Sequence, residues 1–128
     1  RVLHRHPETS GQEQWTSAFL QNEIKALGLP IEMVSRTGFI ATFDTGRPGP
    51  HIVLRADIDA LPVVESEENL KQKRTCISEI PGCAHVCGHD AHMAILLGAA
   101  KILQDAAGFD ETSGGRQRKS NRSYLFLF

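Results

Sequence analysis

The chain has 128 residues, of which 41% are hydrophobic and 23% charged, a length and balance that suit one folded domain with an apolar core. Its formal net charge of −1 gives no indication of binding to nucleic acid or to an anionic membrane. No apolar run approaches the roughly 20 residues of a membrane-spanning helix, and three cysteines, an odd number, do not suit a disulfide framework. We therefore expect a reducing, cytoplasmic setting in which the thiols remain available.

Residues 8–27 are the first predicted element, a helix. Thr9 or Ser10 is a candidate N-cap, and Glu13 follows Ser10 by three residues, the spacing of a capping box. Gly28 is expected to end the helix. The helix carries a broad apolar stripe, which indicates that one side packs on a core. The stripe consists of Trp15, Phe19, Leu20, Ile24 and Leu27.

Three strands are predicted after this helix. Residues 31–35 and 39–43 are short runs rich in β-forming residues, and a turn at 45–50 follows them. Residues 51–59 begin as a nearly continuous apolar run, which is typical of a buried strand in the centre of a sheet.

The second half of the chain predicts one long helix and a final strand. Residues 65–80 are charged and show no clear period, whereas residues 91–105 are apolar almost all round, which predicts a helix buried on most sides. Residues 106–123 form a basic loop, and residues 124–128, "YLFLF", read as a strand at which the chain stops. A strand this apolar is prone to aggregate unless it is paired and covered. We therefore expect that the chain is a piece of a longer protein.

Polar side chains gather after the apolar strand and before the long helix. Asp57 and Asp59 end the strand, and Cys87 and His89 precede the helix. Strands and helices alternate along the chain, which predicts an α/β fold, and in open α/β sheets the sites lie at the carboxyl ends of strands. One site fed by two loops is therefore expected.

Cys87-Gly88-His89 has the chemistry of a metal site. Thiolate and imidazole are good ligands for zinc and similar divalent metals, and residues two apart in an extended segment face the same way. Asp90 can serve as a ligand, as an orienting partner, or as the N-cap of the following helix.

The spacing of these residues alone is also compatible with structural roles. A Cys or His in such a segment is often structural, and the two aspartates could be solvated or paired charges at a strand end. A structural zinc module needs four closed ligands, which Cys83, Cys87, His89 and His92 could supply. The predicted helices and strands already provide a core, so this module is the less favoured alternative.

Four stretches, in this order, carry a family resemblance: "LHRHPE" (3–8), "LRADIDALPVVE" (54–65), "PGCAHVCGHDAHMAILLGAAKIL" (81–103) and "YLFLF" (124–128). From residue 3 to about 105 the chain closely resembles the M20 family of metallopeptidases. The similarity is to the amidohydrolase branch, which contains proteins similar to aminoacylase, hippurate hydrolase and auxin-conjugate amidohydrolases.

This resemblance implies that residues 1–128 are the N-terminal part of a zinc-peptidase-like catalytic domain, with a central mixed sheet flanked by helices. It also implies two divalent metal ions, zinc or manganese, and a lid domain, absent here, through which the whole protein could form a homodimer. Cys87 matches a metal-bridging cysteine, His89 a metal-binding histidine and Asp57 a supporting catalytic aspartate. The remaining motif positions are assigned supporting roles around the site; they are Asp59, His85, Asp90 and His92.

The chain departs from the family pattern in two places. The chain stops at Phe128, before the paired glutamates that supply the family's general base and a metal ligand, and residues 66–80 do not match the usual substrate-side loop. We therefore expect a parent enzyme that hydrolyses N-acyl amino acids, present here as an inactive fragment. The alternative is a non-catalytic short form that binds a metal or a partner.

Overall fold

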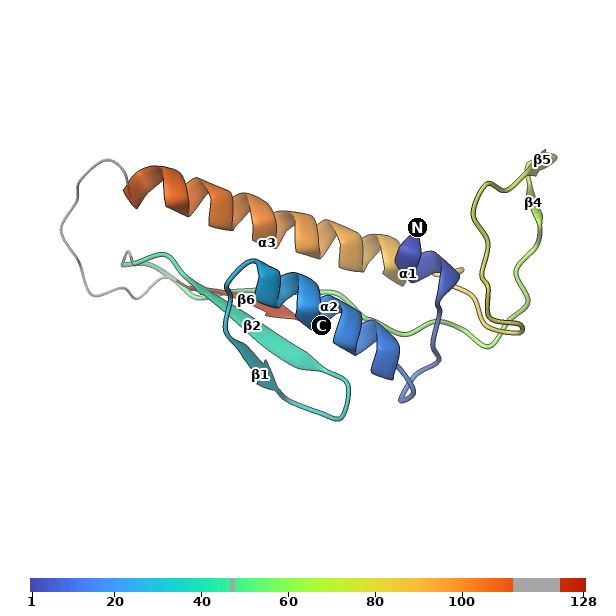
Figure 1. Cartoon of the computed structure of the whole chain (residues 1–128), viewed down its shortest axis with the longest axis horizontal. Coiled ribbons are helices and arrows are strands. Elements are labelled where there is room, and N and C mark those ends of the chain that lie inside the picture. Colours follow the sequence, from blue (N-terminus) through green and yellow to red (C-terminus); the bar gives the residue numbers. More distant parts are fainter. Residues whose placement is uncertain (47, 112–122) are drawn as a thin grey trace.

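The fold is a four-stranded sheet covered on one face by two long helices (Figure 1). It was obtained as a computed structural model that describes residues 1–46, 48–111 and 123–128. The helices are α1 (Val2–Arg5), α2 (Gln14–Ala26) and α3 (His89–Glu111). The strands are β1 (Ile31–Met33), β2 (Phe39–Asp44), β3 (Ile52–Arg55), β4 (Glu68–Asn69), β5 (Gln72–Lys73) and β6 (Ser123–Leu127).

The last strand lies inside the sheet, whose order is β1-β2-β6-β3. β6 runs antiparallel to β2 and parallel to β3, with Phe126 opposite Ala41 on one side and Leu54 on the other. The expected α/β fold with a mixed sheet is thus confirmed. β6 is paired on both sides and Phe126 is fully buried, so the apolar strand has partners within the described residues.

β3 is the edge strand of this sheet, which corrects the prediction of a buried central strand. Ile52 is 37% exposed and Val53 61% exposed, and β6 is the only described strand that pairs with β3. An apolar run shows that a strand can be buried, but the number of its neighbours depends on pairing with distant segments.

The core lies between one face of the sheet and the two helices. Alternate residues of β2 point into it, as the period of two requires. The core is formed by Phe39, Ala41 and Phe43 of β2, Phe126 and Phe128 at the C-terminus, Leu20 and Ile24 of α2, and Met93, Leu96 and Ala100 of α3. Both long helices therefore cover the same face of the sheet.

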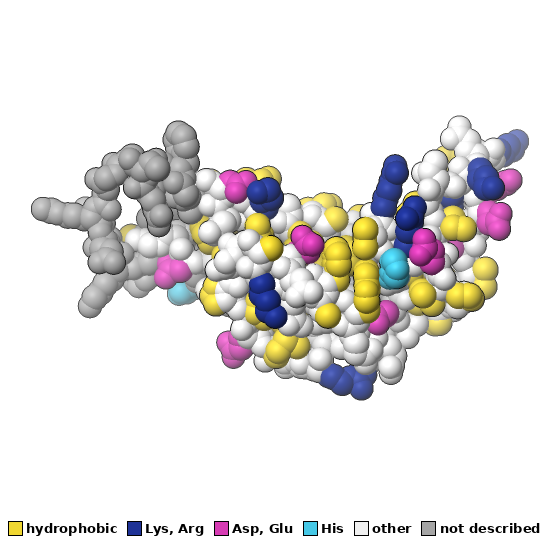
Figure 2. Space-filling view, viewed as in Figure 1, with side chains coloured by type: hydrophobic (Ala, Val, Ile, Leu, Met, Phe, Trp, Pro, Cys, Tyr) yellow, Lys and Arg dark blue, Asp and Glu magenta, His cyan; other side chains and the backbone are white. Residues whose placement is uncertain are grey.

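α3 is buried along one stripe only, so the prediction of burial on most sides is wrong. Met93 is fully buried, whereas Ile95 and Ile102 are each 69% exposed, because the described part of the chain places only one layer against this helix. Acidic and basic side chains are interspersed on the face in Figure 2, with hydrophobic side chains at the surface between them. Within the described residues, no helix has both the length and the apolar character needed to cross a membrane.

The start of α2 also differs from the expected capping box. The Glu8 carboxylate accepts the backbone N–H groups of Trp15 (3.1 Å) and Thr16 (2.7 Å), so a residue well before the helix satisfies its first turn. Glu13 instead accepts the Gly11 N–H and the Thr37 hydroxyl, at 2.8 and 2.9 Å. Ser10 makes no cap, because the chain turns between residues 9 and 13 before the helix begins.

Two loop predictions also need adjustment. Residues 106–111 are the end of α3 rather than a loop, and residues 112–122 lie outside the described residues. The segment 65–80 contains a short hairpin, β4–β5, that projects from one end of the molecule (Figure 1). Its turn places Leu70 (φ 50°) and Lys71 (φ 64°) in the left-handed region, a backbone conformation that is costly for Leu.

Because β6 is internal, its core side chain should dominate the stability of the sheet. We expect Phe126→Ala to lower the free energy of unfolding by about 3–5 kcal/mol, enough to unfold a marginal domain. Val53→Ala on exposed β3 should change it by about 0.5 kcal/mol or less. Urea denaturation followed by circular dichroism measures both, and equal effects would contradict the internal position of β6.

Candidate metal-binding site

The loop after β3 and the start of α3 meet at a hydrogen-bonded pair. Nδ1 of His89 lies 2.9 Å from the backbone oxygen of Asp59 and 3.0 Å from its Oδ1. A carbonyl oxygen can only accept, so Nδ1 carries the hydrogen, and the neutral ring has its lone pair on Nε2. Metal-binding histidines have this arrangement, with one nitrogen held by a carboxylate or carbonyl and the other directed at the metal.

Cys87 provides an exposed free thiol two residues before His89. Gly88 between them has φ 90°, in the left-handed region that favours glycine, and its carbonyl accepts the N–H groups of Ala91 and His92. The segment is therefore a turn into α3 and not extended, so the expected same-facing geometry does not apply. α3 begins at His89, which places Asp90 within the first turn and excludes it as the N-cap.

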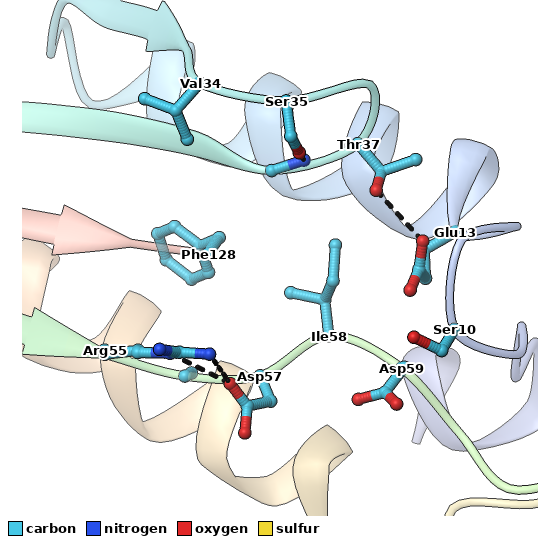
Figure 3. Close-up of a pocket in the computed structure, with 12 residues that line it drawn as sticks. Ser10, Glu13, Val34, Ser35, Thr37, Arg55, Asp57, Ile58, Asp59 and Phe128 are labelled. Atoms are coloured by element: carbon cyan, nitrogen blue, oxygen red, sulfur yellow. Dashed lines mark hydrogen bonds and ion pairs between the residues drawn. The ribbon is translucent and has the colours of Figure 1, made fainter.

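Asp57 and Asp59 have different partners. Oδ1 of Asp57 accepts from Nε (3.0 Å) and Nη2 (2.8 Å) of Arg55, and this ion pair is exposed. Both aspartates line a pocket of about 460 Å³ at the carboxyl end of β3. Figure 3 shows the Arg55–Asp57 pair and the Glu13–Thr37 hydrogen bond on different sides of this pocket. Asp59 alone is bonded to His89, so it is the aspartate that orients the imidazole.

The proposed four-ligand zinc module is not formed. Cys83 is 7% exposed and buried in the interior, whereas Cys87 and His92 are exposed. Burial, and to a smaller extent the negative charge of Glu8, raises the pKa of the Cys83 thiol, which disfavours the thiolate that a metal needs. Within the described ranges, no three His, Cys, Asp or Glu side chains lie close enough together to hold a metal ion. All three cysteines are free.

His85 is buried beside this site. It is 5% exposed, and neither ring nitrogen has a hydrogen-bond partner among the described residues. Burial lowers the pKa of His85; the Asp90 carboxylate opposes this shift, and His4 and His89 add to it. The neutral ring is therefore the favoured form of His85.

The chain resembles proteins of one known family. Residues 53–114 match the family model of Peptidase family M20/M25/M40. The chain is 42% identical over 104 residues to the N-acyl-L-amino acid amidohydrolase of Geobacillus stearothermophilus, covering 80% of this chain and 27% of that protein. It is also 42% identical over 106 residues to the IAA-amino acid hydrolase ILR1-like 2 of Arabidopsis thaliana, covering 82% and 23%. The M20 resemblance is confirmed.

A solved structure of an M20 protein has the same fold as this chain. The YXEP protein of Bacillus subtilis, described as a dinuclear metal-binding peptidase of the M20 family, superposes with a TM-score of 0.78 at 32% identity. The match covers 99% of this chain and 32% of that protein. The chain spans about a quarter of the length of the curated M20 relatives it matches, and it corresponds to their N-terminal part.

A second histidine network was missed by the sequence analysis. Nδ1 of His4 lies 2.8 Å from Oδ2 of Asp90, and its Nε2 lies 3.0 Å from Oε1 of Glu65. Glu65 also accepts from Nη1 of Arg74 (2.9 Å) and from the backbone N–H of Ser78 (2.7 Å). The only sequence signal was that His4 and Glu65 lie in two of the stretches that resemble M20 proteins.

The Glu65 carboxylate has a lowered pKa despite its burial. Burial alone would raise the pKa, but the Ser78 N–H, His4 and Arg74 together hold it below the usual value of 4.5. Below about pH 4.5 the unfolded chain therefore takes up a proton at Glu65 that the folded chain does not. It follows that the stability Glu65 contributes is present above this pH and is lost as the pH falls through the folded-state pKa.

Glu65→Gln should remove this pH-dependent contribution. At pH 7 the variant should be less stable by about 1.5–3 kcal/mol, the contribution of hydrogen bonds to a charged group. The difference from the unmodified chain should shrink between pH 5 and 3, which urea denaturation at each pH measures. Glu68→Gln, at an exposed position in β4, should have the same stability as the unmodified chain at each pH. A constant difference for Glu65→Gln at all pH values would contradict the assignment.

Proposed function

We propose that this chain is the N-terminal part of a metal-dependent amidohydrolase that hydrolyses N-acyl amino acids or similar amide conjugates. The observation that carries the proposal is the His89–Asp59 pair, which engages Nδ1 of His89 and not Nε2, in a residue two positions after the exposed thiol of Cys87. The names of the amidohydrolase relatives support the substrate class, and the dinuclear relative supports divalent metal ions.

The donor set fits part of a metal centre. We infer that Cys87 and His89 are ligands, that Asp59 orients His89, and that Asp57 has a supporting catalytic role. Thiolate and imidazole suit zinc, and carboxylates suit manganese equally well, so two divalent ions of either kind are compatible with this chemistry. The remaining ligands, in this proposal, come from the part of the relatives' length that this chain does not span.

Bound divalent ions would supply a polarised carbonyl and a water of lowered pKa. The chain's own residues prepare their site. Asp59 keeps the Nδ1 proton on His89, so that Nε2 offers its lone pair, and the thiol of Cys87 must lose its proton before it can bind. Asp57, held by Arg55, keeps a carboxylate at the edge of the pocket. Hydrolysis would release a carboxylate and a free amino acid.

The second candidate is a short form without turnover that binds a metal or a partner. It is favoured by the lack of a three-ligand group in the described part of the chain and by the ion pair that already occupies Asp57. Both candidates share a cytoplasmic setting, which the three free cysteines support. Dimerisation through a lid domain remains a proposal for the parent enzyme.

Amidase activity separates the two candidates. We expect the 128-residue chain to release no free amino acid from N-acetyl or N-benzoyl amino acids with added Zn²⁺, Mn²⁺ or Co²⁺. Loss of a general base alone slows such reactions by about 10²–10⁴-fold. A longer form of the protein should be active, and Cys87→Ala should remove most of that activity. Metal-dependent turnover by the short chain that Cys87→Ala abolishes would show that its catalytic machinery is already complete.

Cobalt binding tests the ligands independently of turnover. We expect the chain to bind Co²⁺ weakly, with an absorption band from the thiolate–cobalt bond that Cys87→Ala eliminates. Asp59→Asn should weaken binding by about 10–100-fold, as is common for partners of metal-bound histidines. His6→Ala, which removes a histidine outside this site, is the control and should keep the band. A band that survives Cys87→Ala would rule out this cysteine as a ligand.

A further inference from the structure

We propose that His4 and Glu65 are positioning residues that fix the first turn of α3, and with it His89, through the side chain of Asp90. The inference rests on the proposed function in that His89 is taken as a metal ligand. The contacts involved are distant in sequence: His4 lies 86 positions from Asp90 and 61 positions from Glu65.

The first turn of α3 is held from two directions by two histidine–aspartate pairs. His89 donates to Asp59, which belongs to the segment after β3. Asp90 accepts from His4, which belongs to α1, and α1 lies beside the start of α3 in Figure 1. Adjacent residues point in different directions on a helix, so the two pairs together restrict both the rotation and the tilt of this turn.

Glu65 completes the network on the other side of His4. Both nitrogens of His4 face carboxylate oxygens, with Glu65 on one side and Asp90 on the other. The Glu65 side chain is 4% exposed and accepts from three donors, His4, Arg74 and the Ser78 N–H. A buried carboxylate with this many partners has little freedom to move. His4 is therefore held in place by Glu65 and in turn holds Asp90.

The ring of His85 is buried next to this turn, and neither of its nitrogens has a hydrogen-bond partner among the described residues. The position of the turn therefore depends on the two histidine–aspartate pairs and not on His85.

Histidine side-chain NMR of the 128-residue chain at neutral pH tests the positioning directly. In the unmodified chain, His89 should show the pure Nδ1–H tautomer. In His4→Gln and Glu65→Gln the signal should move toward the average of the two tautomers. Amide exchange at Ala91 and His92, which donate to Gly88, should accelerate about tenfold or more, as expected when one hydrogen bond between charged groups is lost. The double variant should show nearly the same tautomer shift and exchange rates as either single variant, because both substitutions act through Asp90.

Two controls separate positioning from loss of stability. Leu29→Ala removes a buried core side chain away from the network and should lower stability without changing the His89 tautomer. Glu68→Gln repeats the charge change of Glu65→Gln on an exposed strand. If His4→Gln fails to fold, Glu65→Gln, which keeps an acceptor for the Ser78 N–H, decides the result. An unchanged His89 signal in the folded variants, or an equal shift in Leu29→Ala, would overturn the proposal.

A cobalt titration of the same variants separates this proposal from the proposed function. We expect His4→Gln to weaken Co²⁺ binding by up to about tenfold, the lower end of the range for indirect partners of metal ligands. If the unmodified chain shows no thiolate–cobalt band but His89 shifts as described, the metal-site proposal fails and the positioning role stands. If Co²⁺ binds equally to all variants while the His89 signal is unchanged, the positioning role fails and the metal site stands.

Discussion

The insertion of β6 between β2 and β3 is the constraint on which the rest of the structure depends. β3 has no other neighbour among the described strands, so β6 alone fixes its position in the sheet. β6 also brings Phe126 and Phe128 beneath α2 and α3, where Phe128 stacks on Phe39 with ring centroids 5.0 Å apart. The loop that leaves β3 can approach α3 only because β3 is held in this plane.

Hydrogen bonds connect the segment after β3 to the site. After Arg55 the chain leaves the sheet, and the N–H of Ala60 donates to the carbonyl of Glu8 at 2.8 Å. Asp59 is thereby fixed next to this bond and meets His89. The Glu8 side chain caps α2 at the same time, so one residue ties the loop after β3 to the helix that covers the sheet. Packing of the core and orientation of the imidazole are therefore consequences of the same connections.

The local features of the fold could be predicted from sequence, and the non-local ones could not. The helix at Gln14–Ala26 and the strand at Phe39–Asp44 follow from periodicity, since Leu20, Ile24 and alternate β2 residues are buried. The edge position of β3 depends on pairing with residues about 70 positions later in the chain, which no local pattern encodes. Counting apolar residues also overestimated the burial of α3, because Ile95 and Ile102 are apolar yet largely exposed.

The site shows the same division. Cys87 and His89 are neighbours in the sequence, so their shared chemistry could be predicted, although their ligand roles remain a proposal. His4 is far from His89 in the sequence and meets its helix only in three dimensions, and Glu65 contacts His4 on its other side. A single sequence carries no spacing rule for such contacts.

The two aspartates after β3 show why residue type and spacing do not settle a role. Asp57 and Asp59 are two positions apart and would face the same way if the strand continued through them. β3 ends at Arg55, however, so the alternation of a strand does not apply to these residues, and the two carboxylates have different partners. Arg55 neutralises Asp57 at the surface, whereas Asp59 is 28% exposed and bonded to His89 through both its backbone and its side chain. A double contact of this kind fixes both the tautomer and the angle of the ring, which a single carboxylate contact does not. Of the two carboxylates, Asp59 is therefore the one that orients His89, whereas Asp57 is paired with Arg55 at the pocket.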